Sequence, residues 1–127
     1  MSNPNKPEVG SIVWRDLTVD NAEELRDFYS QVVGWTYSAH PMGNYDDYNM
    51  NNPGTGETVA GICHAQGPNG NLPPQWLLYI MVEDVAESAR RCVELGGQII
   101  DGPRSIGEGR FCVIQDPAGA VAALISQ

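Results

Sequence analysis

The chain has 127 residues, the size of one domain, and its 42% hydrophobic and 18% charged residues exclude a disordered chain. Seven basic and sixteen acidic side chains give a net charge of −9, which argues against nucleic acid and anionic membranes, because both need a basic partner. The apolar run 77–82 is far shorter than the ~20 residues that span a bilayer.

The compartment is inferred from the N-terminus and the cysteines. The first ten residues contain no apolar stretch, so we expect no secretory signal. Cys63, Cys92 and Cys112 are odd in number and form no close pairs, a usage typical of reduced thiols. Both observations predict a cytoplasmic protein.

The first half begins with a β-rich segment, 11–19, which predicts a strand. A helix should follow, capped by Asp20 or Asn21 and ended by Gly34 in a left-handed conformation. Its apolar residues recur at helical spacing: Leu25, Phe28, Tyr29, Val32 and Val33. Three short strand candidates come next, at 35–38, 45–50 and 58–63.

The segment 65–74 is rich in glycine and proline and is predicted to be a linker. The second half then repeats the pattern of the first. A strand at 75–82 precedes a helix capped by Asp84 and ended by Gly96-Gly97. Its apolar stripe, which includes Cys92, should face the core, and Cys112 is also predicted to be core.

Three more strand candidates follow, at 98–100, 110–115 and 120–125. The segment 105–110 is interpreted as a hairpin loop, since it lacks the glycine spacing and the lysine of a phosphate-binding loop. The segment 116–119, Asp-Pro-Ala-Gly, predicts a turn.

The two halves are related by a shift of 63 residues, which places Val19 on Val82 and Gly34 on Gly97. Each half therefore has the order β-α-β-β-β. Such a unit cannot close its own sheet, so two of them should combine around a cavity, with the helices outside.

Side-chain alternation separates the two faces of the first strand of each half. Eight residues should face the helices or the edge: Val13, Arg15, Leu17, Val19, Trp76, Leu78, Ile80 and Val82. Six should face the cavity: Trp14, Asp16, Thr18, Leu77, Tyr79 and Met81. The shift pairs Trp14 with Leu77 and Asp16 with Tyr79, so each pair should lie across a pseudo-twofold axis.

Three stretches, DLTVDNAEELRDFYSQVVGW (16–35), VEDVAESARRCVELGG (82–97) and QDPAGAVAAL (115–124), resemble the vicinal oxygen chelate superfamily. This superfamily includes glyoxalases, extradiol dioxygenases, and the fosfomycin- and bleomycin-resistance proteins. The resemblance implies an α+β fold of two βαβββ modules in tandem, forming a curved, mostly antiparallel sheet around a cavity. It covers one domain, 1–127, with module 1 at about 10–64, the linker at 65–74 and module 2 at about 75–127, and it implies a homodimer.

Most enzymes of this superfamily hold a divalent metal with ligands from four strands. The corresponding positions here are Trp14, Leu77, Ala123 and the Ala60/Gly61 region. None of these residues supplies the imidazole or carboxylate that such cations prefer, so we expect no metal and no other cofactor. His40, in a loop before Pro41, and His64, at a strand end, are interpreted as structural histidines.

The candidate ligand-binding residues are Trp14, Asp16, Leu77, Tyr79, Met81 and Ala123, and the candidate catalytic residues are Asp16 and Tyr79. One hypothesis is a metal-independent module that binds a small, partly aromatic organic molecule, as the bleomycin-resistance branch does by sequestration. A second is a glyoxalase-like lyase or isomerase that uses a displaced metal site or none, in which Asp16 or Tyr79 moves a proton on a small carbonyl compound. A third is a structural or regulatory protein whose cavity is filled by its own side chains.

Overall fold

A computed structural model describes residues 7–127, and the chain divides into two compact units. The N-terminal unit is Arg15–Trp76, and the C-terminal unit is Leu77–Gln127 together with residues 7–14. Part of the N-terminus, on which the prediction of no secretory signal rests, lies outside the described residues. No helix of residues 7–127 has the length and apolarity that a membrane crossing requires.

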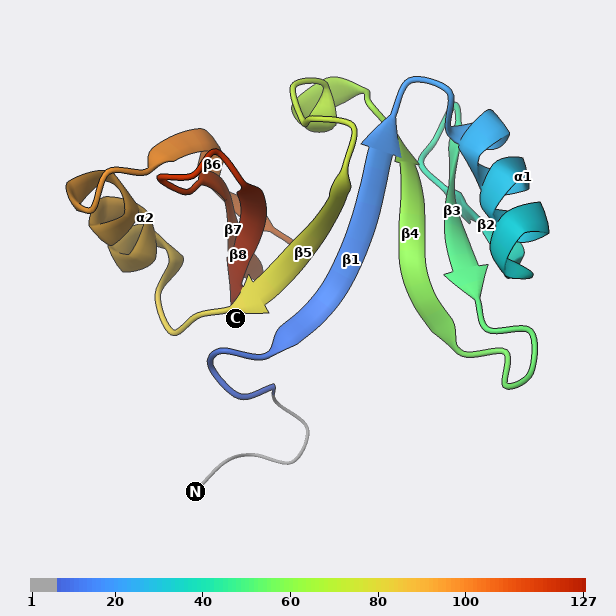
Figure 1. The fold of residues 1–127 in the computed structure, drawn as a ribbon, viewed down its shortest axis with the longest axis horizontal. Helices are drawn as coiled ribbons and strands as arrows, with labels where there is room; N and C mark the ends of the chain where they lie inside the picture. The colour runs from blue at the N-terminus through green and yellow to red at the C-terminus, as the bar shows by residue number, and fades with distance from the viewer. Residues whose placement is uncertain (1–6) are drawn as a thin grey trace. The chain divides into compact units, whose positions relative to one another are not determined.

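The N-terminal unit contains one helix and four strands, most of β1 among them (Figure 1). In chain order they are β1 (Ile12–Val19), α1 (Ala22–Val33), β2 (Thr36–Pro41), β3 (Asp46–Asn51) and β4 (Thr58–His64). The strand order is β2-β3-β4-β1, with β1 parallel to β4 and the other pairs antiparallel.

The helix α1 packs on one face of these strands through Ala22, which is fully buried, and through Leu25 and Tyr29. Two further apolar residues of the predicted stripe, Phe28 and Val32, are 52% and 64% exposed. Both lie to the side of the helix face that contacts the sheet, and Val33 in the last turn is also exposed. The predicted apolar stripe is therefore wider than the face of α1 that is buried.

The C-terminal unit repeats the pattern with α2 and four strands. In chain order they are β5 (Trp76–Met81), α2 (Val85–Glu94), β6 (Gln98–Ile106), β7 (Gly109–Gln115) and β8 (Val121–Ser126). The strand order is β5-β8-β7-β6, with β5 parallel to β8 and the other pairs antiparallel. A 3-10 turn, Gly67–Asn69, lies in the linker.

The core on the α2 side of this unit contains Val85, Ala89, Cys112 and Leu124, with Ile80 and Val82 packed against it. The predicted helix-facing role of Ile80 and Val82 is confirmed, and so is the core position of Cys112. Two predictions are corrected here. Leu78 is 42% exposed, and Cys92 is only partly buried, with its thiol directed at the backbone oxygen of Gln98.

Two strands run three or more residues beyond their predicted ends. The strand β2 continues through His40 to Pro41, so His40 lies in a strand and not in a loop. The strand β6 runs to Ile106, which reduces the predicted hairpin loop to Gly107 and Glu108. The irregular pairing between Asp101 and Arg104 lets β6 pass Gly102-Pro103, a dipeptide that reads as a turn in sequence.

The two helices begin differently, although both caps were predicted. Asp84 caps α2, and its carboxylate accepts a hydrogen bond from the Glu87 backbone N–H at 3.2 Å. Asn21 occupies the same place before α1, but its amide donates to the Glu24 carboxylate at 2.6 Å and makes no bond to the helix backbone. Gly34, with φ of 91°, ends α1 in the predicted left-handed conformation.

The α+β class and the two β-α-β-β-β modules are confirmed, and four of the six strand pairs within the units are antiparallel. In each unit the helix packs on one face of the strands, and we call the opposite face the helix-free face. This is the face on which the sequence predicts a ligand.

Candidate functional site

Strand register places polar residues on the helix-free face of the N-terminal unit. Asp16 is paired with Gly61, and Thr18 with Cys63, along the parallel β1–β4 ladder. Asn49 of β3 faces Gly61 from the other side. Directly paired residues share a face, so Gly61 is a position without a side chain between an amide and a carboxylate.

The acidic residue Asp47 lies at the edge of this face and is buried, with 6% exposure. Its Oδ1 atom accepts a hydrogen bond from the His64 backbone N–H at 2.8 Å. Burial is the largest cause of a raised pKa at the Cys63 thiol, and the nearby carboxylates of Asp16 and Asp47 raise this pKa further. Cys63 is therefore a protonated thiol beside two carboxylates, and a poor nucleophile.

The imidazole of His64 bridges two acidic residues on different elements. Its Nε2 lies 2.9 Å from Oε2 of Glu23 in α1, and its Nδ1 lies 3.4 Å from Oδ1 of Asp47. Burial opposes protonation most strongly, but Glu23 and Asp47 together outweigh it and raise the pKa of His64. The interpretation of His64 as a structural histidine agrees with this arrangement, which ties α1 to β3 and β4.

The helix-free face of the C-terminal unit is apolar and aromatic. Tyr79 pairs with Ala123, and Met81 pairs with Ile125. The rings of Tyr79 and Phe111 stack, with centroids 5.7 Å apart and planes inclined by 29°. Six residues of this face are buried: Leu77, Tyr79, Met81, Phe111, Val113 and Ala123. The predicted residues Tyr79, Met81 and Ala123 are thus brought together on one face, and alternation along β5 adds Leu77.

Two charged residues on this face, Arg104 and Asp101, were missed in the sequence. Arg104 of β6 is paired with Phe111 of β7, and its guanidinium carbon lies 4.6 Å from the centre of the Phe111 ring. Its Nε and Nη2 atoms are both 3.1 Å from Oδ2 of Asp101. Because 98–100 was predicted to be a short strand, Arg104 was placed outside the sheet, and no sequence signal pointed to it.

The predicted residues divide between the two units. Asp16 lies on the helix-free face of the N-terminal unit, whereas Leu77, Tyr79, Met81 and Ala123 belong to the C-terminal unit. Trp14, two residues before Asp16 on β1, belongs to the C-terminal unit. The predicted pairing of Asp16 with Tyr79 across a pseudo-twofold axis stays a prediction.

The residues at the superfamily's metal-binding positions do not fit a metal ion. Trp14, Leu77 and Ala123 carry no ligand atom, and register selects Gly61, rather than Ala60, as the position that shares a face with Asp16. Within residues 7–127 there is no group of three or more His, Cys, Asp or Glu side chains arranged to hold a metal.

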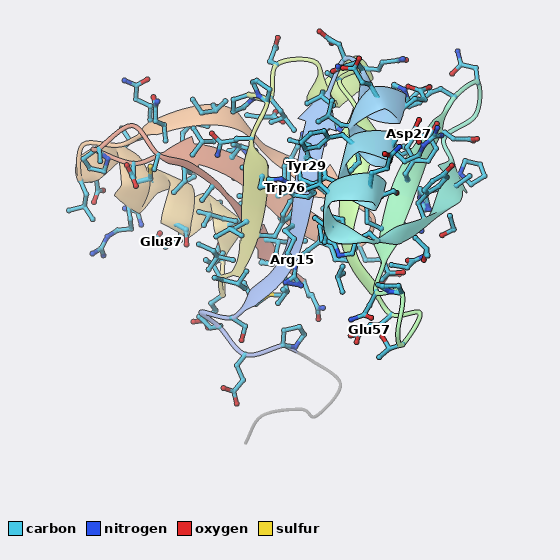
Figure 2. The ribbon with its side chains drawn as sticks, turned by 45° about the vertical axis from the view of Figure 1, so that its right-hand side comes forward. Arg15, Asp27, Tyr29, Glu57, Trp76 and Glu87 are labelled. Atoms are coloured by element: carbon cyan, nitrogen blue, oxygen red, sulfur yellow. The ribbon has the colours of Figure 1, made fainter. Side chains whose placement is uncertain are left out.

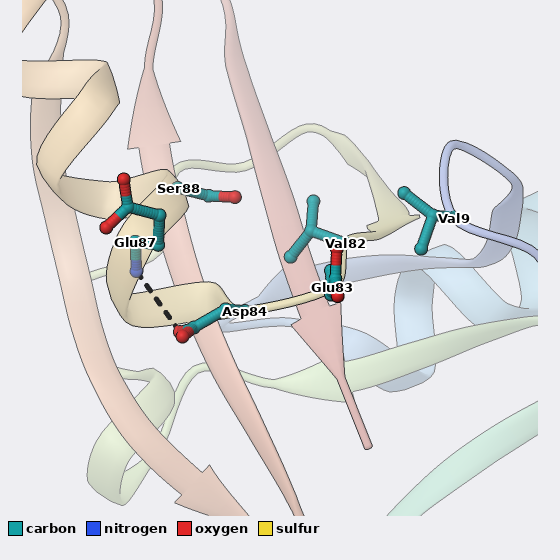
Figure 3. A pocket seen from close by; sticks show the side chains of 6 residues that line it. All are labelled: Val9, Val82, Glu83, Asp84, Glu87 and Ser88. Atoms are coloured by element: carbon teal, nitrogen blue, oxygen red, sulfur yellow. Dashed lines mark hydrogen bonds between the residues drawn. The ribbon is translucent and has the colours of Figure 1, made fainter.

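Several surface recesses lie within single units. One is beside the first turn of α2 and is lined by Val9, Val82, Glu83, Asp84, Glu87 and Ser88 (Figure 3). Its carboxylates are exposed, and the Asp84 side chain caps the helix, so this recess has a structural explanation. Another recess, of about 460 Å³, lies at the β6–β7 turn. Its lining includes Ile106 and Ile125, which lie on the same face of the strands as Arg104.

The sequence profile described as the Glyoxalase/Bleomycin resistance protein/Dioxygenase superfamily matches residues 10–124. The chain therefore belongs to this superfamily, and the resemblance stated from its motifs is confirmed.

Two groups of curated relatives share about a third of the aligned residues. A "Putative glyoxylase CFP32" of Mycobacterium tuberculosis is 32% identical over 119 residues, which are 93% of this chain and 44% of that protein. The "Anthracycline biosynthesis protein DnrV" of Streptomyces peucetius is 30% identical over 111 residues, 87% of this chain and 39% of that protein. The chain thus spans less than half the length of these relatives.

Solved structures share the fold at low identity. A methylmalonyl-CoA epimerase in complex with methylmalonyl-CoA and NH4+ matches with a TM-score of 0.55 and 13% identity, over 94% of this chain and 96% of that chain. A hypothetical protein, BH1468 from Bacillus halodurans, matches with a TM-score of 0.59 and 12% identity over the same shares. These likenesses establish the fold alone.

Proposed function

We propose that this protein binds a small, partly aromatic organic molecule without a metal ion, on the helix-free faces of its strands. The observation that carries the proposal is the side-chain chemistry of the four usual chelating positions. An indole, an isobutyl group, a methyl group and a glycine bind no hard cation, yet they suit an organic ligand.

The aromatic face of the C-terminal unit supports the same proposal. The stacked Tyr79 and Phe111 rings, together with Met81, make this face apolar, which is the character that ligand-binding surfaces usually have. The relatives named for anthracycline biosynthesis add support, because anthracyclines are polycyclic aromatic molecules. Sequestration of the kind found in the bleomycin-resistance branch is the form of binding that this proposal takes.

We propose further that the protein is a cytoplasmic homodimer. Among the strands of residues 7–127, β2 and β6 each have one hydrogen-bonded neighbour, and open strand edges favour pairing with another chain. Its three cysteines are free thiols, as in a reducing compartment.

The test uses N-phenyl-1-naphthylamine, an uncharged aromatic probe whose fluorescence rises in apolar surroundings. EDTA-treated protein should bind it saturably, with one probe per chain, and the affinity should not change when zinc or nickel is added. Trp14→Leu should weaken binding by about two- to tenfold, since an aromatic contact is worth about 0.5–1.5 kcal/mol beyond its buried area.

The control removes the exposed apolar residues of α1 with a Phe28→Ser/Val32→Ser double variant. This variant should bind the probe as the unmodified protein does, because Phe28 and Val32 lie on the outer side of α1. The proposal is wrong if binding is not saturable, if it requires added metal, or if the double variant abolishes it.

The relative named as a putative glyoxylase favours a second candidate, a lyase or isomerase acting on a small carbonyl compound. Asp16 would then be the acid or base on the helix-free face of the N-terminal unit, and Tyr79 the alternative proton donor. Turnover of methylglyoxal with a thiol, followed by its loss in Asp16→Asn, would establish this activity. No turnover with metal-free or zinc-loaded protein would exclude it for that substrate.

The third hypothesis, a filled cavity, is favoured by the burial of Leu77, Tyr79 and Met81, which are 3%, 7% and 5% exposed. The probe experiment separates it from the first, because a face filled by its own side chains binds no aromatic probe.

A further inference from the structure

Arg104 is a guanidinium held on the apolar face that the proposed function assigns to a ligand. The arginine lies against the Phe111 ring at 4.6 Å, and Phe111 in turn stacks with Tyr79. Contact with an aromatic ring and an ion pair to Asp101 fix the plane of the guanidinium before any ligand arrives. The Arg104 side chain remains 28% exposed, so solvent reaches it.

The position of Arg104 differs from that of the other arginines in residues 7–127. Arg15 and Arg110 alternate onto the opposite faces of their strands, and Arg26, Arg90 and Arg91 belong to helices. By register, Arg104 is thus the one arginine of the described residues that lies on a helix-free face. By pairing and alternation, Phe111, Val113 and Ile125 lie on the same face, together with Asp101.

The charge of the whole chain makes this cation significant. A net charge of −9 repels anions from the surface in general, so an anion would bind only where a local cation offsets that repulsion. A guanidinium has five N–H donors in a planar fork that matches the two oxygens of a carboxylate or a similar oxyanion.

We infer that the helix-free face of the C-terminal unit binds an aromatic ligand that carries an oxyanion, with Arg104 holding the oxyanion and the apolar side chains of Ile106 and Ile125 on the same face holding the ring system. This inference rests on the proposed function and adds the charge of the ligand to it. The recess beside Ile106 and Ile125 continues the same face toward the β6–β7 turn, where an apolar part of the ligand can lie.

Two probes with one aromatic framework test this inference. N-phenyl-1-naphthylamine is uncharged, and 8-anilino-1-naphthalenesulfonate is the same molecule with an added sulfonate. The unmodified protein should bind the sulfonate roughly tenfold or more tightly than the uncharged probe, because hydrogen bonds to charged groups are among the stronger ones. Arg104→Gln should remove this preference and leave binding of the uncharged probe within about twofold.

The matched control is Arg110→Gln, which removes the same charge from the opposite face of the neighbouring strand. Its preference for the sulfonate should match that of the unmodified protein. Equal binding of both probes to the unmodified protein, or an equal loss in Arg104→Gln and Arg110→Gln, overturns the inference but leaves the proposed function intact. If neither probe binds the unmodified protein, the proposed function itself fails.

A second variant covers the case in which Arg104→Gln loses both probes through a defect in folding. Asp101→Asn keeps Arg104 and removes the negative charge beside it, so the sulfonate should bind several-fold more tightly, with no change for the uncharged probe. An unchanged or weakened affinity for the sulfonate in Asp101→Asn overturns the inference. Rising salt should reduce the sulfonate preference of the unmodified protein.

Discussion

The imidazole of His64, at the end of β4, lies 2.9 Å from the carboxylate of Glu23 in the first turn of α1, although 41 residues separate them in sequence. The Tyr45 ring packs edge-on against the imidazole at 5.3 Å, and the Tyr48 ring lies at 6.2 Å. This ion pair joins the helix of the N-terminal unit to its sheet, and its strength depends on pH.

The raised pKa of His64 means that its contribution to stability is present below the unfolded value near 6.5 and is lost as pH rises through the folded value. The pKa of Glu23 is lowered, first by its own backbone N–H and then by His64, so its contribution is lost as pH falls below about 4.5. The melting temperature of His64→Gln should therefore fall furthest below that of the unmodified protein between about pH 4.5 and 6.5, and this difference should shrink toward pH 9. His40→Gln changes an exposed histidine of β2 and should follow the unmodified protein. A deficit of His64→Gln that is constant over this range would contradict the ion pair.

Gly97 should not tolerate a side chain. A Cβ atom there would lie 2.5 Å from the Cys92 thiol and 2.8 Å from the Gln115 carbonyl oxygen. Gly97→Ala should therefore lower the free energy of unfolding by about 2 kcal/mol through overpacking, as measured by urea denaturation. Gly54→Ala is the control, since its nearest contact is an ordinary 3.4 Å and the site is exposed. Equal stabilities of the two variants would show that the end of α2 is packed differently.

The two helix caps should respond unequally to alanine. Asp84→Ala removes an acceptor from the Glu87 backbone N–H and should cost about 1 kcal/mol. Asn21→Ala breaks only a bond between two exposed side chains and should cost less, roughly 0.5 kcal/mol or below. Urea denaturation of both variants measures the difference, and an equal or reversed order would contradict the cap geometry.

The Tyr29 hydroxyl should stabilise the cluster of rings that Tyr29 of α1 forms with Trp35 and Trp76. It accepts a hydrogen bond from the Trp76 indole N–H at 3.1 Å, and the two rings meet edge-on (Figure 2). Tyr29→Phe keeps the ring and leaves the half-buried indole N–H without this acceptor, so the free energy of unfolding should fall by about 1 kcal/mol. Tyr37→Phe, at an exposed tyrosine of β2, is the matched control. Tryptophan fluorescence should shift in Tyr29→Phe alone, and a shift in neither variant would refute the bond.

Local signals predicted the fold well because they act over a few residues. Asp84, Gly34 and the Asp116 turn each follow from chemistry between near neighbours, such as the Asp116 carboxylate accepting from Ala118 and Ala120 backbone N–H groups. The half-chain repeat then supplied the order of the elements.

The missed features depend on contacts between distant residues. Arg104 followed Gly102-Pro103, a turn-like pair that the bulged β6–β7 ladder accommodates. The partners of His64 lie 17 and 41 residues away, so no spacing rule could identify them. Phe28 and Val32 fit a helical stripe, but periodicity alone gives no measure of how wide the buried face is.

The apolar outer flank of α1 has a consequence for handling the protein. The side chains of Phe28, Val32 and Val33 leave an apolar surface exposed to solvent. Copies of the protein repel one another through their negative net charge. That repulsion vanishes near the isoelectric point of about 4.4, where the protein should aggregate and precipitate. The pH during purification should therefore stay well above this value.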